Sequence, residues 1–228
     1  MPIIVGIDGT GGDPVPGFGR NGRYDRDFAR SFVRRICFGR GPNAQYNRGP
    51  LVLGGGLHAA VVNGNSFIET KRREMGTGEP ILLTGFSRGG LGVLMIARDL
   101  QRQNIPVEAL LLFDAIDMYM FANVETVPTN VRNVYHARSR ADAGSRQNWR
   151  KKDCGGNPFN PNVQYTERAF RCTHGAMGGT PQHDASRPNE FIDELGSGRT
   201  NVTYGNNPII SEQVWAAVQP FIQTHHFI

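Results

Sequence analysis

Residues 80–103 predict a strand, a tight turn and a helix that follow one another without a break. Pro80 to Thr84 is a short apolar run bounded by a turn signal, which is typical of a buried strand. The turn, residues 85–90, holds three glycines, and the segment from Leu91 to Gln103 places apolar residues on one helical face. A strand that passes directly into a helix indicates a parallel sheet covered by helices.

The rest of the chain supplies further parts of such a fold. Three more strands are expected, at residues 2–7, 107–113 and 131–137. Three more helices are expected, at residues 25–38, 57–74 and 211–225, and Pro220 should kink or split the last one. The stretches expected to be irregular are residues 13–22, 39–56 and 139–171. We see no repeat and no linker, so the sequence predicts one α/β domain over residues 1–228, with a mostly parallel sheet and an irregular loop or cap region at about 139–171.

Composition excludes several other classes of protein. The chain has 228 residues, and 39% of them are hydrophobic, which is typical of a globular domain and not of a disordered chain. No apolar run approaches the roughly 20 residues that span a bilayer. The N-terminus also lacks the pattern of a signal peptide, so we expect a cytoplasmic protein, with export by a route that needs no signal peptide left open. We expect reduced thiols at Cys37, Cys154 and Cys172, with a Cys154–Cys172 bridge as the alternative.

The formal net charge of +5 comes from 22 arginines and only three lysines. Arginine suits phosphate and carboxylate binding because its planar fork can donate two hydrogen bonds at once. The arginines are scattered, however, with no basic tail and no aromatic-rich nucleic-acid motif. We therefore expect no nucleic-acid partner.

The turn after the central strand has the form Gly-x-Ser-x-Gly, which is the pattern of a nucleophile elbow. In such a turn the Oγ of Ser87 stands above the C-terminal edge of the sheet, and the N–H of Arg88 points at a developing oxyanion. Gly85 and Gly89 let the strand and the helix approach each other closely. The alternative is an ordinary strand-to-helix turn in which Ser87 caps the helix.

A serine nucleophile needs a base, and the base needs a carboxylate that orients it. In folds that use this turn, the acid and then the histidine follow the serine along the chain. Asp114, at the end of the next strand, is the first candidate acid, and Asp117 and Asp142 are the alternatives. His174 lies in a second glycine-rich turn, after all of these residues, and is the candidate base.

The other five histidines are weaker candidates for the base. His183, in the segment Pro-Gln-His-Asp at 181–184, is the nearest rival. His58 and His136 lie before or inside expected helices and strands, so we expect packed or surface groups there. His225 and His226 lie near the C-terminus, where fraying is common.

The first strand ends in a glycine-rich loop, residues 6–12. The backbone of Gly9 and Thr10 in this loop could supply a second oxyanion donor. The loop also has some likeness to phosphate-binding loops, but its glycines are out of register with G-x-G-x-x-G. Pro14 and Pro16 also prevent the helix that a dinucleotide site needs, so nucleotide binding is a minor alternative.

Five motifs along the chain carry a family resemblance. They are Gly-Ile-Asp-Gly-Thr-Gly at 6–11, Gly-Phe-Ser-Arg-Gly-Gly at 85–90, Phe-Asp-Ala-Ile at 113–116, His-Ala at 136–137 and Thr-His-Gly-Ala-Met-Gly-Gly at 173–179. In this order they resemble the α/β-hydrolase domain of type VI secretion phospholipase effectors and of their bacterial relatives, over residues 3 to about 180. The resemblance implies Ser87 as nucleophile, Asp114 as acid and His174 as base, with Gly9 and Thr10 beside the oxyanion hole.

The resemblance also implies an activity and a set of partners. It implies a serine ester hydrolase of the lipase, phospholipase or carboxylesterase type, which forms an acyl-enzyme and needs no cofactor and no metal. An ester or lipid would be the substrate, and a membrane surface and, for a secreted effector, a cognate inhibitor protein are further partners. A thioesterase, a peptidase and a non-catalytic binding domain on the same scaffold stay open as alternatives. The Arg-rich stretch 139–171 could cover the site, bind an anionic head group or be a plain surface loop.

Overall fold

The computed structural model describes residues 1–11, 20–51, 55–117, 125–147, 152–156, 163–194 and 197–228. Its central feature is a six-stranded sheet in the order β2-β1-β3-β4-β6-β8, in which every neighbouring pair is parallel. The strands are β1 (Ile3–Ile7), β2 (Ala44–Asn47), β3 (Ile81–Phe86), β4 (Val107–Phe113), β6 (Val131–Ser139) and β8 (Gln164–Phe170). The expected α/β fold with a parallel sheet is therefore confirmed.

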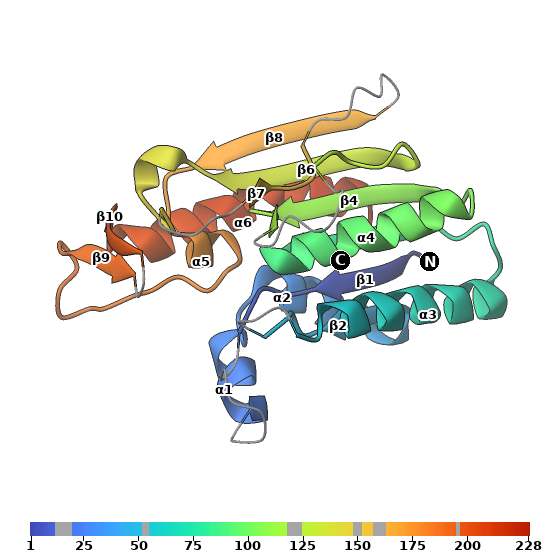
Figure 1. Cartoon of the computed structure of the whole chain (residues 1–228), viewed down its shortest axis with the longest axis horizontal. Coiled ribbons are helices and arrows are strands. Elements are labelled where there is room, and N and C mark those ends of the chain that lie inside the picture. The colour runs from blue at the N-terminus through green and yellow to red at the C-terminus, as the bar shows by residue number, and fades with distance from the viewer. Residues whose placement is uncertain (12–19, 52–54, 118–124, 148–151, 157–162, 195–196) are drawn as a thin grey trace.

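Helices cover both faces of this sheet, as Figure 1 shows. The helices are α1 (Arg20–Asp27), α2 (Phe32–Phe38), α3 (Leu57–Met75), α4 (Arg88–Arg102), α5 (His174–Met177) and α6 (Asn206–Thr224). Helices α3 and α4 pack on one face, and α2 and α6 pack on the other. None of these described helices is long and apolar enough to cross a membrane.

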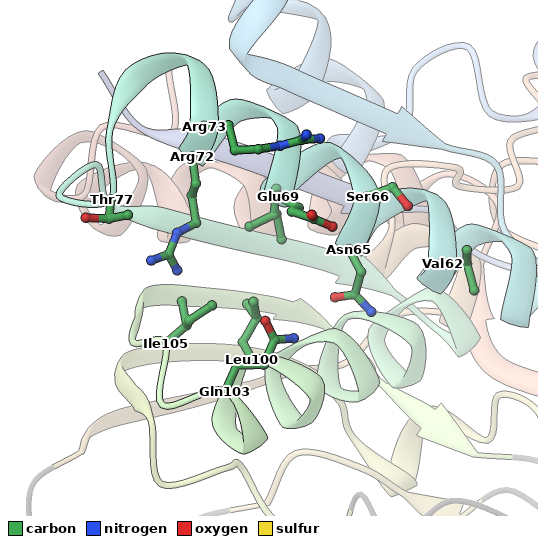
Figure 2. A pocket seen from close by; sticks show the side chains of 11 residues that line it. Val62, Asn65, Ser66, Glu69, Arg72, Arg73, Thr77, Leu100, Gln103 and Ile105 are labelled. Atoms are coloured by element: carbon green, nitrogen blue, oxygen red, sulfur yellow. The ribbon is translucent and has the colours of Figure 1, made fainter.

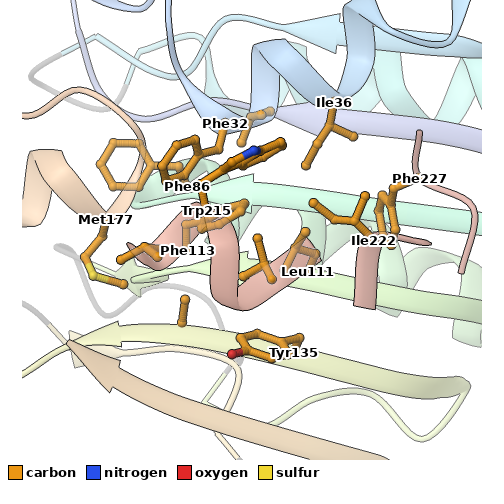
Figure 3. Packing of buried hydrophobic residues seen from close by; sticks show 14 of the residues in the cluster. Phe32, Ile36, Phe86, Leu111, Phe113, Tyr135, Met177, Trp215, Ile222 and Phe227 are labelled. Carbon is orange, nitrogen blue, oxygen red and sulfur yellow. The ribbon is translucent and has the colours of Figure 1, made fainter. Parts of the chain in front are cut away.

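The strands supply both hydrophobic cores because successive side chains point to opposite faces. In β1, Ile3, Val5 and Ile7 belong to the cluster under α3 and α4, whereas Ile4 belongs to the cluster under α2 and α6. The second cluster is rich in aromatic rings, and Figure 3 shows Trp215 of α6 close to Phe32 of α2, at 5.0 Å between ring centroids. Both faces of the sheet are thus buried, which explains the continuous apolar runs in the sequence.

The expected single helix at residues 25–38 is two helices. The helix α1 ends at Asp27, and α2 begins after Ser31, whose Oγ accepts a hydrogen bond from the Arg34 N–H at 3.1 Å. Ser31 also donates to the carboxylate of Asp8, at the end of β1. Ser31 has φ −59° and ψ 148°, which is not helical, and its contact with Asp8 supports this break between the helices.

The two edge strands were expected to be irregular, and this expectation was wrong. The strand β2 lies within the expected irregular stretch 39–56, and β8 lies within 139–171. Both are too polar to carry a buried-strand pattern, because an edge strand leaves many of its side chains exposed. Of the loop expected at 13–22, residues 13–19 lie outside the described part, and α1 already begins at Arg20.

Several smaller elements complete the fold. The strands β9 (Phe191–Glu194) and β10 (Gly198–Thr203) form an antiparallel pair, and β5 (Ile116–Asp117) pairs with β7 (Lys152–Asp153). The last helix, α6, starts five residues before the expected Ser211 and continues through Pro220 without being split. Cys37, Cys154 and Cys172 are all buried, and no disulfide joins any two of them.

One histidine lies fully buried in the sheet. His136, in β6, has no exposed surface, and its Nε2 accepts a hydrogen bond from the Ala115 N–H at 3.3 Å. Burial disfavours the charged imidazolium, and Arg138 adds to this effect, so the pKa of His136 falls to about 4. The fold therefore holds this histidine neutral.

The stability of the protein should fall at acidic pH because of His136. Its pKa is 6.5 in the unfolded chain and about 4 in the fold, so the unfolded state binds more protons between these values. The stabilising contribution is complete above the higher value and is lost as the pH falls toward the lower one. We expect the free energy of unfolding of the wild type, minus that of His136→Gln, to fall by about 2 kcal/mol between about pH 7.5 and pH 5 in urea titrations.

Comparing the wild type with His136→Gln cancels the contribution of Asp8 to the pH dependence of stability. That contribution has the opposite sign to the contribution of His136. Burial raises the pKa of Asp8 from 3.8 to about 7, so its contribution is lost as the pH rises through this range. Asp8 is present in both proteins and cancels in the difference. A difference that does not change with pH would contradict a neutral buried His136.

Candidate active site

The turn between β3 and α4 holds Ser87 in a strained backbone conformation. Ser87 has φ 56° and ψ −128°, in a region that residues other than glycine rarely adopt. A Cβ on Gly85 would lie 2.7 Å from the backbone of Gly90, and a Cβ on Gly89 would lie 2.1 Å from the Ile7 carbonyl oxygen. Glycine is therefore required at both positions, as a nucleophile elbow requires.

Ser87 occupies the N-cap position of α4 but does not cap the helix. Its side chain makes no capping hydrogen bond. Its Oγ instead lies 2.8 Å from the Nε2 of His174. This contact argues against the alternative in which Ser87 is an ordinary helix cap.

The structure brings Ser87, His174 and Asp114 together in one chain of hydrogen bonds. The other ring nitrogen of His174, Nδ1, lies 2.6 Å from Oδ2 of Asp114. Each of the three residues is about 4% exposed. An imidazole placed between a hydroxyl and a carboxylate can accept the hydroxyl proton while the carboxylate fixes its orientation.

Asp114 is positioned by the ends of two neighbouring strands. It follows β4 directly, and its N–H donates to the Ala137 carbonyl of β6 at 2.7 Å. The N–H and the hydroxyl of Ser139 donate to its carboxylate at 3.0 and 2.7 Å. These donors and His174 supply hydrogen bonds in place of the water that a buried carboxylate loses.

The two alternative acids lie elsewhere. Asp117 is buried in β5, which pairs with β7. Asp142 forms a surface ion pair with Arg140 at 2.7 Å, and half of its side chain is exposed. Of the three candidate carboxylates, the structure therefore places Asp114 on His174.

His174 is the first residue of the short helix α5, and its backbone is anchored there. Its N–H donates to the Ser145 Oγ at 2.8 Å, and that hydroxyl in turn bonds to the buried carboxylate of Glu194 at 2.9 Å. The preceding residue, Thr173, caps α5, and its hydroxyl lies 3.1 Å from Oδ1 of Asn207. Segments that are far apart in the sequence thus fix the position of the ring.

The remaining histidines lie away from Ser87 or are exposed. His183 and His58 are exposed, and His136 is buried in β6. His225 and His226 follow the last helix. None of them contacts a candidate acid by a hydrogen bond among the described residues.

The loop after β1 packs beside the elbow. The guanidinium of Arg88 is buried, and its Nε donates to the Thr10 Oγ1 at 2.6 Å. Its Nη2 donates to the Leu51 carbonyl at 3.1 Å. The backbone N–H of Arg88 belongs to the first turn of α4, directly after Ser87.

A buried carboxyl group lies under the same loop. Asp8 has no exposed surface, and Oδ1 accepts the Gly9 N–H at 2.9 Å. Oδ2 accepts hydrogen bonds from Ser31 and, at 3.0 Å, from the Tyr46 hydroxyl. Burial raises the pKa of Asp8 to about 7, since these donors only partly replace water.

A cavity of about 450 Å³ lies between α3 and α4, but it is remote from Ser87. Figure 2 shows Arg72 of α3 pointing across the cavity toward the side where Ile105 and Leu100 lie. Leu100 lies 13 residues beyond Ser87 along the same helix, which corresponds to about 20 Å at 1.5 Å per residue. This cavity is therefore at the end of α4 opposite the elbow. Among the described residues, no cluster of His, Cys, Asp or Glu could hold a metal ion.

Three solved structures that resemble this chain share little sequence identity with it. No family model matches the sequence, and no curated protein matches it. The RedJ thioesterase of the prodiginine biosynthetic pathway of Streptomyces coelicolor aligns with 79% of this chain and 81% of its own, at 13% identity and a TM-score of 0.43. A YdeN-like hydrolase from Pectobacterium atrosepticum aligns with 76% of this chain and 79% of its own, at 13% identity and a TM-score of 0.39.

A third neighbour is an α/β hydrolase superfamily protein from Enterococcus faecalis. It aligns with 71% of this chain and 53% of its own, at 11% identity and a TM-score of 0.31. Likenesses this distant carry no argument about substrate or catalytic residues. The case for an activity therefore rests on the geometry of the site.

The residues that support the site were not predicted from the sequence. Ser139, Ser145 and Glu194 form the hydrogen bonds that hold Asp114 and His174. Ser139 was within reach of sequence reasoning, because it follows the expected strand at 131–137 and a parallel strand ends at the same edge as Asp114. Ser145 and Glu194 lie in polar segments with no local pattern that marks them.

The elbow should be intolerant of a methyl group at Gly89. A Cβ there would lie 2.1 Å from the Ile7 carbonyl oxygen, which is a backbone atom and cannot rotate away. A Cβ at Gly78 would meet nothing within 4 Å, so Gly78→Ala is the matched control. In urea unfolding we expect Gly89→Ala to cost about 2 kcal/mol or more and Gly78→Ala less than about 0.5 kcal/mol. Similar stabilities for the two variants would contradict this packing.

Proposed function

We propose that this protein is a serine hydrolase of the α/β-hydrolase type that cleaves carboxylic esters. The observation that carries the proposal is the continuous contact from Asp114 Oδ2 through His174 to the Oγ of Ser87, at 2.6 and 2.8 Å. The strained elbow supports it, because an ordinary turn has no need of φ 56° at a serine. A binding domain without catalysis would not need this arrangement.

In the proposed mechanism, Ser87 and His174 carry out acyl transfer in two steps. His174 Nε2 takes the proton of Ser87 as Oγ forms a bond to the ester carbonyl carbon, and the carbonyl oxygen becomes negatively charged. His174 then gives this proton to the leaving alcohol oxygen as the ester C–O bond breaks, which leaves an acyl-enzyme. In the second step His174 takes a proton from water, the water oxygen attacks the acyl carbon, and Ser87 leaves with the proton.

The other residues of the site stabilise the charges of this reaction. Asp114 holds the proton-bearing Nδ1 of His174 and stabilises the imidazolium that forms. The backbone N–H groups of Arg88 and of the loop after β1 would donate to the oxyanion. No step in this sequence requires a metal or a cofactor.

Within this class, we favour a lipid or another oxygen ester as the substrate. The support is the motif resemblance to secretion phospholipases described above. Thioester and peptide substrates use the same groups and are the competing substrate classes. A membrane surface, a cognate inhibitor and export from the cell remain predictions of the resemblance. Arg146 lies in the Arg-rich stretch that could contact a head group. Its Nε is 3.8 Å from Oε1 of Glu194.

Ser87→Ala should abolish both labelling and turnover without unfolding the protein. A fluorophosphonate reacts only with an activated serine, so we expect one adduct on the wild type and none on the variant by intact-mass spectrometry. The loss of one buried hydroxyl should leave the melting curve of the variant close to that of the wild type. A panel of phospholipids, short esters, thioesters and peptides, assayed in parallel, identifies the substrate class.

Two outcomes would count against the proposal. Retained ester hydrolysis by Ser87→Ala would exclude Ser87 as the nucleophile. A folded wild type that neither labels nor hydrolyses any substrate of the panel would favour the non-catalytic binding domain.

Among the candidate acids, Asp114→Asn should cost far more activity than the other two exchanges. An amide at this position no longer stabilises the imidazolium, so we expect kcat to fall by about 10³-fold to 10⁴-fold. Asp117→Asn and Asp142→Asn should stay within about threefold of the wild type, because neither carboxylate reaches His174. The control for folding is the melting temperature of each variant. A larger loss for Asp117→Asn than for Asp114→Asn would reassign the acid.

A further inference from the structure

The peptide bond between Gly9 and Thr10 lies against the residues that flank Ser87. A Cβ placed on Gly9 would lie 2.5 Å from the ring of Phe86. On the other side of the nucleophile, the Nε of Arg88 donates to the Thr10 Oγ1 at 2.6 Å. This peptide is therefore positioned beside the proposed nucleophile.

Only one of the two N–H groups of this segment can serve an oxyanion. The Gly9 N–H already donates to Oδ1 of Asp8 at 2.9 Å. The Thr10 N–H donates to no residue that the structure describes. An oxyanion donor has to be aimed at the developing charge before the reaction begins, so Thr10 fits this role and Gly9 does not.

The direction of the Thr10 N–H is set by the carbonyl of Gly9. In a trans peptide these two groups lie in one plane and point in opposite directions. The Tyr24 hydroxyl donates to this carbonyl oxygen at 2.9 Å, and its own oxygen accepts the Gly49 N–H at 2.7 Å. The hydrogen bond from Tyr24 to the Gly9 carbonyl holds the peptide in one orientation.

The side chain of Tyr24 is itself fixed in place. It is 4% exposed, and its ring stacks on Phe28 with 4.4 Å between the ring centroids. Burial and the nearby Asp8 raise the pKa of Tyr24, so its hydroxyl keeps its proton at neutral pH and can donate. The hydroxyl therefore acts as a rigid donor.

We infer that Tyr24 is a positioning residue of the oxyanion hole. Together with the guanidinium of Arg88, its hydroxyl clamps the Gly9–Thr10 peptide so that the Thr10 N–H faces the ester oxygen that becomes charged. The inference rests on the proposed function, and Tyr24 acts through Thr10 without touching the substrate. Because this N–H interacts most strongly with the transition state, loosening it lowers kcat and leaves KM nearly unchanged.

The test compares Tyr24→Phe with Tyr135→Phe. Each variant loses one hydroxyl from a buried ring, but Tyr135 lies in β6 and packs on Phe221 of α6. With p-nitrophenyl acetate we expect kcat of Tyr24→Phe to fall about 10-fold, less than the 10²-fold to 10³-fold loss for a deleted oxyanion donor, with KM within about twofold. Tyr135→Phe should stay within about twofold of the wild type in both constants.

A tetrahedral inhibitor separates a positioning role from a merely structural one. Phenylboronic acid forms a bond to the serine oxygen and places a boron hydroxyl in the oxyanion hole. Its inhibition constant should rise about 10-fold in Tyr24→Phe and stay unchanged in Tyr135→Phe. The fraction of active enzyme, titrated with a fluorophosphonate, should be the same in both variants, whereas partial misfolding would lower that fraction and leave the inhibition constant alone.

The outcomes distinguish this inference from the proposed function. A wild type that is inert to the fluorophosphonate would overturn both. A reactive wild type with equal kcat and equal boronate inhibition in Tyr24→Phe would overturn the inference alone. If Tyr24→Phe does not fold, Thr10→Val decides, because it keeps the N–H but removes the oxygen that Arg88 holds. Full kcat in folded Thr10→Val would then contradict the clamp.

Discussion

The packing of backbone against backbone at the start of α4 is the contact on which the candidate site depends. Gly89 lies against the carbonyl of Ile7, and Gly85 lies against Gly90. The N–H of Ser87 bonds to the end of β4 at 2.9 Å, and its carbonyl accepts the N–H of Ile116 at 3.2 Å. These contacts offset the roughly 1–3 kcal/mol that an unusual backbone conformation costs. They also bring the first turn of α4, the end of β1 and the end of β4 together at one edge of the sheet.

Buried carboxylates then connect this edge of the sheet to distant parts of the chain. A buried carboxylate is costly unless several donors replace its water. Asp114 gains donors from Ser139 and His174, and Glu194 gains donors from Ser145 and the Arg146 N–H. Each carboxylate thus holds together segments that the chain order separates. His174 is fixed from its ring by one carboxylate and from its backbone, through Ser145, by the other.

The parts of the fold that follow from a local sequence pattern were predictable, whereas those that depend on contacts between distant residues were not. The central strands and α4 were predictable because strands buried on both faces are continuously apolar, whereas β2 and β8 are polar edge strands. The break before α2 depends on the bond from Ser31 to Asp8, which joins residues 23 positions apart. The same distinction holds at the site. Chain order and turn chemistry pointed to Ser87, Asp114 and His174, but nothing local marks Glu194 or Tyr24.

In the proposed clamp, the catalytic groups lie on strands that are buried in the cores, whereas the positioning residue lies on a short helix. Ser87 and Asp114 follow β3 and β4, whose residues are almost all buried in the two cores. Tyr24 belongs to α1, an eight-residue helix that is too short to be stable alone, and among the described side chains of this helix Tyr24 is the buried one. We therefore expect local opening of α1 to need less free energy than opening of the central strands. On the proposed clamp, such an opening would release the Thr10 N–H and weaken oxyanion stabilisation while the Ser87–His174–Asp114 contacts stay intact.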